Sequence, residues 1–266
     1  MATPAQRHPF FDHPGALPMA HRGGAKSPAN AGFENTRRAF ATAVAMGYRY
    51  LETDVHASRD GEVFAFHDPH LGRVTDIQGD IGDLDAQQVL AARVGGTEAI
   101  PTMRSLFEEF PHARFNVDVK AAAAIEPMLR LLDECDAYER VCLASFSSLR
   151  LAKLRRRLAD RVPTSMGTTE IGLLRLLPWH RARALVARAG ASCVQVPPAH
   201  GRFVVITDAF LDHCHALGLP VHAWTVDDAA QMHDLLDRGV TGIITDRIDV
   251  LRDVLTARGE WMDPPA

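Results

Sequence analysis

Hydrophobic and polar positions follow a regular rhythm along most of the chain. Short apolar, β-branched runs are each followed by an Ala-, Leu- and Arg-rich stretch with apolar residues at helical spacing. The rhythm predicts strands at 17–22, 50–57, 114–120, 141–146, 162–167, 193–196, 220–226 and 242–245. It predicts helices at 37–46, 103–110, 122–134, 147–158, 170–189 with an interruption at Pro178, 207–217, 227–237 and 248–257. Together these elements form eight successive strand–helix units.

Strands that alternate with helices favour a parallel sheet. The chain has 266 residues, a length typical of a single closed (β/α)8 TIM barrel. An open doubly wound sheet is the main alternative fold. We favour the barrel because polar or aromatic residues recur at the ends of several strands, whereas an open sheet gathers its site at one switch point. These residues are His21, Glu52, Asp54, Asp118, Lys120 and Trp224. In a barrel they would converge on one mouth.

We expect a single domain over residues 1–266, with two departures from the barrel rhythm. Residues 1–16 are rich in Pro, His and polar side chains and suggest a flexible arm. Residues from about 57 to 100 suggest an insertion after the second strand, because they hold many Gly and Asp and one possible helix at 85–92. Either Asn35 or Thr36 is expected to cap the first helix.

Composition excludes several classes of function. The chain is 47% hydrophobic and 23% charged with a net charge of -4, which gives no electrostatic case for a nucleic-acid or anionic-membrane partner. A small-molecule substrate is expected, and the oligomeric state is left open. No apolar run has the length of a signal peptide or a membrane span, so we expect a cytoplasmic protein without integral membrane association. The cysteines form no CxxC or zinc spacing and are expected to be reduced and buried: Cys135, Cys142, Cys193 and Cys214.

The densest chemistry lies in residues 51–68, LETDVHASRDGEVFAFHD. Glu52, Asp54 and His56 stand two apart, so on a strand they project from the same face. The turn at 58–61 and a short returning strand at 62–66 would bring His67 back towards these carboxylates. His56 enters the loop and is interpreted as a surface or supporting residue.

Asp118 and Lys120 have the same spacing within an otherwise apolar strand. Their side chains should point the same way, so an Asp118–Lys120 ion pair is the simplest interpretation. Glu52 and Asp54 would crowd the same mouth, however, and several neighbouring carboxylates favour a bound cation. Carboxylate ligands without a thiolate indicate a hard divalent ion, Mg²⁺ or Ca²⁺.

Three segments have plainer interpretations. Trp224 is expected either in the core or in the wall of the pocket. The apolar stretch 173–179, LLRLLPW, could contact lipid or a partner, but a buried helix is the simpler expectation. The arginine-rich stretch RARALVAR at 181–188 is interpreted as a solvated helix face.

Motifs along nearly the whole chain resemble those of the glycerophosphodiester phosphodiesterase family. They occur in the family's order: AHRGG at 20–24, FENT at 33–36, LETDVHASRDGEVFAFHDPHLGRVT at 51–75, IPTM at 100–103, NVDVK at 116–120, AWTVDD at 223–228 and GIITDR at 242–247. The first, third and fifth are the most specific. The resemblance implies a (β/α)8 barrel, a divalent cation, and hydrolysis of glycerophosphodiesters to sn-glycerol 3-phosphate and an alcohol.

The resemblance also implies roles for individual residues. Glu52, Asp54 and Asp118 would be metal ligands, His21 and His67 the catalytic acid and base, and Arg22 and Lys120 phosphate-binding groups. From their positions near these residues, we also expect Trp224 to contact the substrate and Glu34, Asn35, His56 and Asp68 to support the site from behind. Many family members have Glu where this chain has Asp118, so the shorter side chain would bind through water or favour a different ion.

Other functions stay open at this level. The family includes lysophospholipase D and sphingomyelin-cleaving relatives, so the motifs do not identify the alcohol that is released from the substrate. A metal-dependent barrel lyase also uses acidic ligands and a divalent ion, but it has no need for two histidines. A barrel that binds phosphodiesters without turnover is the remaining alternative.

Overall fold

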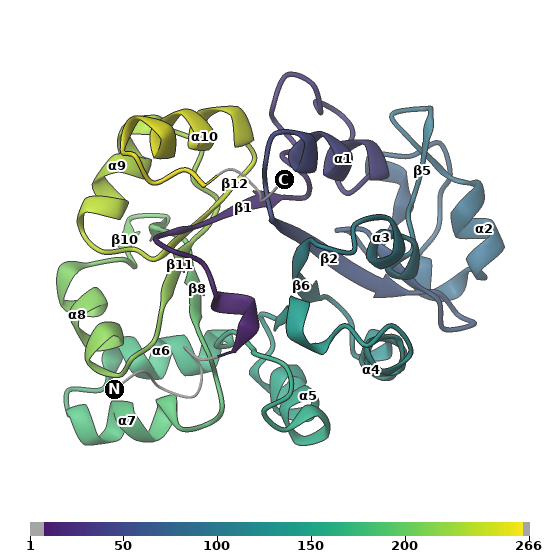
Figure 1. The fold of residues 1–266 in the computed structure, drawn as a ribbon. Coiled ribbons are helices and arrows are strands. Elements are labelled where there is room, and N and C mark those ends of the chain that lie inside the picture. The colour runs from purple at the N-terminus through teal and green to yellow at the C-terminus, as the bar shows by residue number, and fades with distance from the viewer. Residues whose placement is uncertain (1–7, 263–266) are drawn as a thin grey trace.

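The computed structural model describes residues 8–262, and these form a barrel of parallel strands surrounded by helices (Figure 1). Its strands follow the order β7-β6-β2-β1-β12-β11-β8, with parallel pairing throughout. Their bounds are β1 Leu17–His21, β2 Tyr50–Ala57, β6 Arg114–Val119, β7 Val141–Ala144, β8 Val194–Val196, β11 Val221–Ala223 and β12 Gly242–Thr245.

The segment predicted as a strand at 162–167 closes the ring. Thr164 forms a parallel bridge to Leu143 of β7, and Ser165 forms one to Cys193 just before β8. Within the described residues, this segment bridges β7 and β8, the two ends of the sheet, and occupies the eighth strand position of the barrel. The structure is therefore a (β/α)8 barrel, and the open sheet considered as a rival is wrong.

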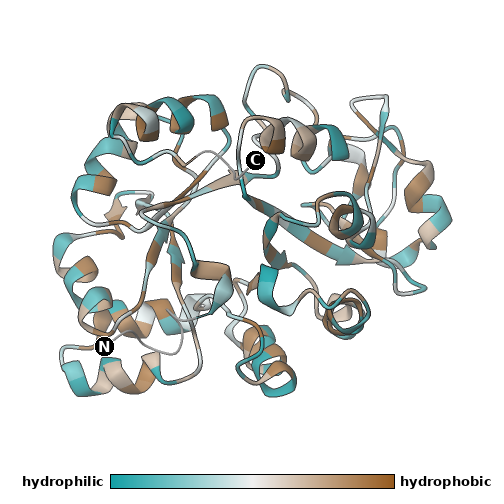
Figure 2. Cartoon of the chain, viewed as in Figure 1, coloured by the Kyte–Doolittle hydropathy of each residue, from teal (hydrophilic) through white to brown (hydrophobic). Residues whose placement is uncertain are grey.

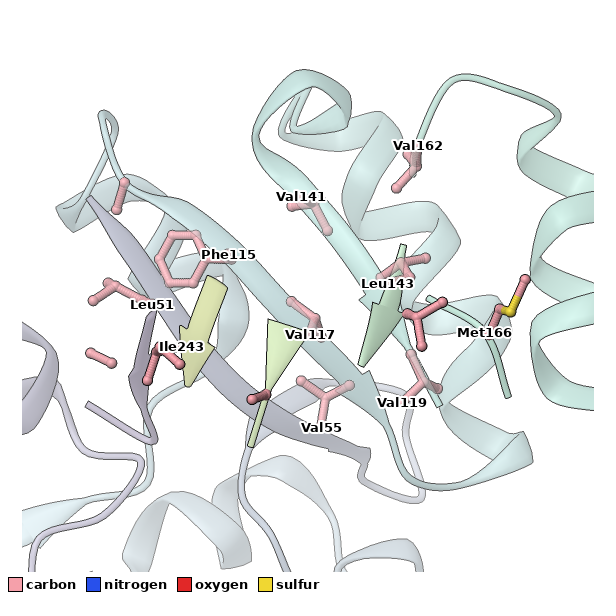
Figure 3. Packing of buried hydrophobic residues seen from close by; sticks show 14 of the residues in the cluster. Leu51, Val55, Phe115, Val117, Val119, Val141, Leu143, Val162, Met166 and Ile243 are labelled. Carbon is pink, nitrogen blue, oxygen red and sulfur yellow. The ribbon is translucent and has the colours of Figure 1, made fainter. Parts of the chain in front are cut away.

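Successive side chains along each strand point alternately towards the surrounding helices and towards the barrel interior. Leu51 and Val55 of β2 pack with Phe115, Val117 and Val119 of β6 in the main hydrophobic cluster, as Figure 3 shows. This cluster lies between the strands and the helices. The intervening positions of the same strands face the barrel interior, as expected for a period of two. The inward face is thus free to carry the polar residues.

Amphipathic helices cover the outside of the barrel, with hydrophobic and hydrophilic residues mixed along each of them (Figure 2). Their bounds are α1 Arg37–Ala45, α3 Met103–Glu109, α4 Ile125–Glu134, α5 Ser148–Leu158, α6 Thr168–Leu176, α7 His180–Ala187, α8 Asp208–Ala216, α9 Ala229–Asp237 and α10 Ile248–Ala257. Pro178 separates α6 from α7, as predicted. No helix in the described part of the chain combines the length and apolarity needed to cross a membrane.

The stretch 173–179 differs from the buried helix that we expected. Leu174 is fully buried, but Leu173, Leu176 and Trp179 are exposed. A short antiparallel hairpin, β9 Ala199–His200 with β10 Phe203–Val204, lies between β8 and α8 and is exposed as well.

The insertion after β2 has a small core of its own. It starts with β3 Val63–Ala65, which pairs antiparallel with β2, and continues through α2 Ala86–Ala91 and the hairpin β4 Arg93–Val94 with β5 Glu98–Ala99. Its buried residues are Phe64, Phe66, Leu71, Ile81, Val89, Ala92, Val94 and Ile100. The insertion lies on the opposite side of the barrel from α7 (Figure 1). Its first strand is the one that returns His67 to the barrel.

The expectation of a flexible arm is wrong for residues 8–16, whereas residues 1–7 lie outside the described part. Phe10 is fully buried against the lower interior of the barrel, with its ring 5.4 Å from the ring of Tyr50. The Tyr50 hydroxyl donates a 2.7 Å hydrogen bond to the Phe10 carbonyl, and Arg114 donates one of 2.6 Å to the Asp12 carbonyl. The segment closes the end of the barrel opposite the mouth.

We expect the substitution Phe10→Ala to lower the free energy of unfolding by about 3–5 kcal/mol, because it removes a fully buried aromatic side chain. Urea denaturation measures this loss. Phe203→Ala is the matched control, because Phe203 is 52% exposed, and its cost should stay under about 1 kcal/mol. A Phe10 variant as stable as the control would mean that residues 8–16 do not close the barrel.

Candidate active site at the barrel mouth

Strand register brings the predicted acidic residues together. On β1 and β2, His21 stands opposite Glu52, and on β2 and β6, Asp54 stands opposite Asp118. All these side chains face inward near the carboxyl ends of their strands. Glu52, Asp54 and Asp118 are each under 10% exposed, so their negative charges lie close to one another and away from bulk water.

Two cationic side chains, Lys120 and Arg22, neutralise part of the charge of this cluster. Lys120 Nζ lies 2.7 Å from both Asp54 Oδ1 and Asp118 Oδ2, so the simple ion pair that the sequence suggested is present. Arg22 Nε lies 3.1 Å from the other oxygen of Asp54, and its backbone N–H donates to Glu52 at 3.2 Å. The buried carboxylates are therefore held by short contacts to partly buried cationic groups, as buried charges require.

The negative charge that these cations leave uncompensated affects the pKa values of the carboxyl groups. Burial, reinforced by the neighbouring charge of Asp54, raises the pKa of Glu52 to about 7 although His21 opposes it. Burial also raises the pKa of Asp118, and Lys120 only partly opposes that shift. Burial would raise the pKa of Asp54 too, but Lys120 and Arg22 outweigh it and lower that pKa. The cluster still favours additional positive charge.

His21 is oriented by an aspartate that the sequence analysis left without a role. Its Nδ1 lies 2.6 Å from Asp246 Oδ1 at the end of β12, and its Nε2 lies 3.8 Å from Glu52. Burial alone would lower the pKa of His21, but Glu52 and Asp246 together raise it. Lys26 contacts the second oxygen of Asp246 at 2.9 Å. His21 is thus fixed in position and favours its protonated form.

His67 has an equivalent support from the insertion. Its Nδ1 lies 2.6 Å from Asp68, and Asp68 is paired with Arg73. Arg73 donates to Glu34 at 2.5 Å, and Glu34 accepts a 3.1 Å bond from Arg22. A continuous chain of charged contacts therefore connects His67 with the residue that holds Asp54.

Asn35 and His56 hold these groups from behind. Thr36 caps α1 by accepting from the Ala39 N–H, which leaves the Asn35 amide free to donate to Asp54 at 3.3 Å. His56 is buried, and its Nε2 lies 3.1 Å from the His67 carbonyl, so it supports the loop. It does not line the cavity into which the three carboxylates open. Burial lowers its pKa.

The loop after β1 needs glycine for a steric reason. Arg22 has a φ of 51°, and Gly23 follows with a φ of 82°. A Cβ atom at Gly23 would lie 2.7 Å from the Ala39 Cβ of α1. Because side chains rarely adopt such a conformation and no room exists for one, Gly23 lets the loop turn tightly against the helix. The turn places the Arg22 side chain above Asp54.

A cavity of about 440 Å³ opens above this cluster and has two chemically different sides. One side is formed by the charged residues described above. The other is formed largely by apolar side chains: Phe146, Met166, Ile171, Val196, Pro197, Val205, Trp224 and Ile244. The rings of Phe146 and Trp224 meet edge to face with centroids 5.5 Å apart. Trp224 therefore lies in the wall of the cavity, as one of the two sequence interpretations proposed.

A polar layer lies next to the carboxylates inside the barrel. Asn116 and Gln195 exchange hydrogen bonds of 2.8 and 3.3 Å through their side-chain amides, and Gln195 also lies 3.3 Å from His222 Nδ1. Asn116 stands opposite Glu52 in the sheet register. This layer supports the floor of the site without adding charge.

The donor set fits a hard divalent cation in its chemistry. It consists of three carboxylates, and Asp118 Oδ1 is a buried acceptor without a hydrogen-bond partner among the described residues. In residues 8–262, however, no three His, Cys, Asp or Glu side chains form a ready-made metal centre. Lys120 lies between Asp54 and Asp118 in this arrangement.

Sequence reasoning missed several residues of the site. Asp246 follows the last strand directly, so the strand-end argument applied to the other residues would have found it. Gln195 likewise stands near the end of a short strand. Phe146, which meets Trp224, ends the predicted strand at 141–146, so the same argument would have found it. Arg73 carried no such signal, because its contacts with Glu34 and Asp68 depend on how distant loops pack.

Comparison with known proteins agrees with this geometry. The model of the glycerophosphoryl diester phosphodiesterase family matches residues 21–250. The chain is 44% identical over 261 residues to a probable glycerophosphodiester phosphodiesterase 2 of Mycobacterium tuberculosis, with 95% of each chain covered. It is 26% identical to lysophospholipase D GDPD1 of Rattus norvegicus, with 89% of this chain and 85% of that protein covered.

Solved structures share the fold. A putative glycerophosphoryl diester phosphodiesterase from Silicibacter pomeroyi superposes with a TM-score of 0.78 at 21% identity, covering 96% of this chain and 98% of that one. An Oleispira antarctica phosphodiesterase, solved in complex with the product sn-glycerol-3-phosphate, has a TM-score of 0.75 at 19% identity, covering 91% of this chain and 97% of that one.

We expect Asp246→Asn to lower the pKa of His21, because the substitution removes one of the two negative charges that raise it. An NMR titration of the His21 ring measures this change. Asp249→Asn is the control: Asp249 lies near the same strand end but contacts Arg247 and Ser27, so it should leave the His21 pKa unchanged. An unchanged pKa in both variants would contradict the orienting role of Asp246.

Proposed function

The chain belongs to the glycerophosphoryl diester phosphodiesterase family and hydrolyses glycerophosphodiesters, and on this premise we propose how the residues of the mouth divide the reaction. The products are sn-glycerol 3-phosphate and an alcohol. The observation that carries the proposal is the pair of aspartate-bound histidines, His21 and His67, beside one cluster of carboxylates and cations.

Proton transfer is assigned to the two histidines. One must take a proton from the attacking hydroxyl, which comes from water or from the substrate's own glycerol 2-hydroxyl. In the second case the alcohol leaves as a cyclic glycerol phosphate forms, and water must then open that ring to give sn-glycerol 3-phosphate. The other must give a proton to the leaving alkoxide. The raised pKa of His21 favours its protonated form and suits the acid, which leaves His67 as the base. Asp246 and Asp68 support this division by holding each ring through Nδ1.

Charge stabilisation is assigned to the groups between the histidines. Arg22 and Lys120 would contact the non-bridging phosphate oxygens, whose negative charge makes a phosphodiester resistant to attack. Glu52, Asp54 and Asp118 would hold a divalent cation, Mg²⁺ or Ca²⁺, supported by the raised pKa of Glu52 and the unpartnered oxygen of Asp118. When bound, such a cation supplies Lewis-acid polarisation of the phosphate.

The apolar side of the cavity makes lysophospholipase D activity the second candidate. Phe146, Met166, Ile171 and Val205 offer an aliphatic alcohol a water-poor surface beside the charged groups. A lyase and a binding barrel without turnover have no comparable support. The cytoplasm stays the proposed compartment, supported by cysteines that are all free: Cys135, Cys142, Cys193 and Cys214.

We expect His21→Ala and His67→Ala each to lower turnover of glycerophosphocholine by roughly 10²- to 10⁴-fold, the range for loss of a general acid or base. Steady-state kinetics measure this effect. His70→Ala is the matched control, because His70 is exposed and bound to Asp80 in the insertion, and it should retain activity. Turnover within a few fold of wild type in either site variant would refute that histidine's assignment.

We expect binding of Mg²⁺ or Ca²⁺ to the metal-free protein to weaken as the pH falls through about 7, because Glu52 is protonated below its pKa of about 7. A cation must then displace that proton, so its apparent affinity should fall by up to about tenfold per pH unit below the pKa. Isothermal titration calorimetry at pH 6 and pH 8 measures the difference. Equal cation affinities at pH 6 and pH 8 would exclude Glu52 as a ligand. Glu62→Gln is the control variant, because Glu62 lies outside the cavity.

A further inference from the structure

An exposed apolar surface lies beside the barrel mouth, and we call it the α6–α7 patch. It consists of Leu173, Leu176 and Trp179 around the end of α6, with Phe203 and Val204 of the β9–β10 hairpin. Leu176 is 75% exposed and Trp179 is 69% exposed, so the patch presents large apolar side chains to solvent. The hairpin and helix are joined by Arg175, whose guanidinium lies 5.5 Å from the centroid of the Phe203 ring.

The patch is continuous with the apolar side of the cavity. Ile171, one turn before Leu174 on α6, lines the cavity, and so does Val205, which directly follows the hairpin. Figure 1 shows α6 and α7 together on the side of the barrel away from the insertion. A molecule or surface that covers the patch would therefore lie at the edge of the mouth.

The charge around the patch is opposite to that of the whole chain. Residues 168–204 contain five arginines and one acidic residue, Glu170, although the chain as a whole has a net charge of -4. Glu170 is already paired with Arg155 at 2.5 Å. The pKa of His213 on the neighbouring α8 is lowered by slight burial and then by the positive charge of Arg183 and Arg175, although Asp212 opposes the shift. The net charge thus concealed a local excess of cations.

We propose that the α6–α7 patch docks on an anionic lipid surface. Leucine and tryptophan side chains partition into the boundary between headgroups and acyl chains, and surrounding arginines attract acidic headgroups. The arginines flanking the apolar residues are Arg175, Arg181, Arg188 and Arg202. A second copy of the chain is a poorer occupant, because a two-fold dimer through this patch would bring two arginine-rich surfaces together. Docking orients the mouth towards the lipid, and it is independent of the reaction assigned to the histidines.

A vesicle sedimentation experiment tests docking without any diester substrate. Full-length protein is mixed with vesicles of equal phosphatidylglycerol and phosphatidylcholine, with vesicles of phosphatidylcholine alone, and with buffer. We expect partition into the anionic vesicles, weakened by 0.5 M salt. Leu176→Asp with Trp179→Ala should weaken partition at least about tenfold, and Arg181→Glu with Arg188→Glu should do so to a similar degree.

Leu90→Asp is the matched control, because Leu90 is an exposed leucine of α2 in the insertion on the other side of the barrel, and it should partition like wild type. Sedimentation of wild type no greater than in buffer would overturn the proposal, as would equal partition of the patch variants and wild type. Equal binding to neutral vesicles would refute the role of the arginines. If the wild-type protein dimerised with rising concentration but bound no vesicles, and the Leu176/Trp179 variant stayed monomeric, the patch would be assigned to a second copy of the chain.

Hydrolysis of water-soluble glycerophosphocholine by the same proteins separates this proposal from the proposed function. The patch variants should retain that activity, because neither Leu176 nor Trp179 lines the cavity. Vesicle binding by a protein that cleaves no diester would refute the assigned reaction and leave docking intact. Normal cleavage of glycerophosphocholine without vesicle binding would refute docking and leave the assigned reaction intact.

Discussion

Three buried carboxylates at the mouth of the barrel dictate the arrangement around them. Glu52, Asp54 and Asp118 arrive there because alternate residues of adjacent strands face inward, and their low exposure strengthens the repulsion between their charges. Lys120 and Arg22 offset part of that repulsion through short contacts. Glu52, together with Asp246, raises the pKa of His21, and burial with the charge of Asp54 raises the pKa of Glu52 to about 7. A site with this residual negative charge suits a cation and an anionic substrate together.

The two histidines are supported from opposite directions along the chain. Asp246, at the last strand, holds His21, and Asp68, at the entrance of the insertion, holds His67. The second support is longer, because Arg73 connects Asp68 to Glu34 and from there to Arg22. This connection explains why an insertion with a separate small core belongs to the site: it carries one histidine and the arginine that fixes its partner.

The mouth is asymmetric in both polarity and charge. The charged residues come from the early strands and the loop after β12, whereas the segments between β7 and α8 supply Phe146, Ile171 and Val205 to the apolar side. Part of this stretch, residues 168–204, concentrates arginine in a chain that is acidic as a whole. Net charge therefore described the molecule poorly, since the electrostatic field that a partner meets is set by the local distribution.

Local pattern determined the strands, the helices, the break at Pro178 and the identity of the acidic and histidine residues, because period-two and helical spacing are properties of consecutive positions. The same pattern placed Glu52, Asp54 and Asp118 on inward faces. Only the tertiary structure decided that Phe10 closes the barrel, that Asp246 meets His21, that Arg73 bridges Asp68 and Glu34, and that Leu176 and Trp179 face solvent. Each of these depends on segments far apart in the chain, or on which face of a helix finds a neighbour, and no local spacing encodes such contacts.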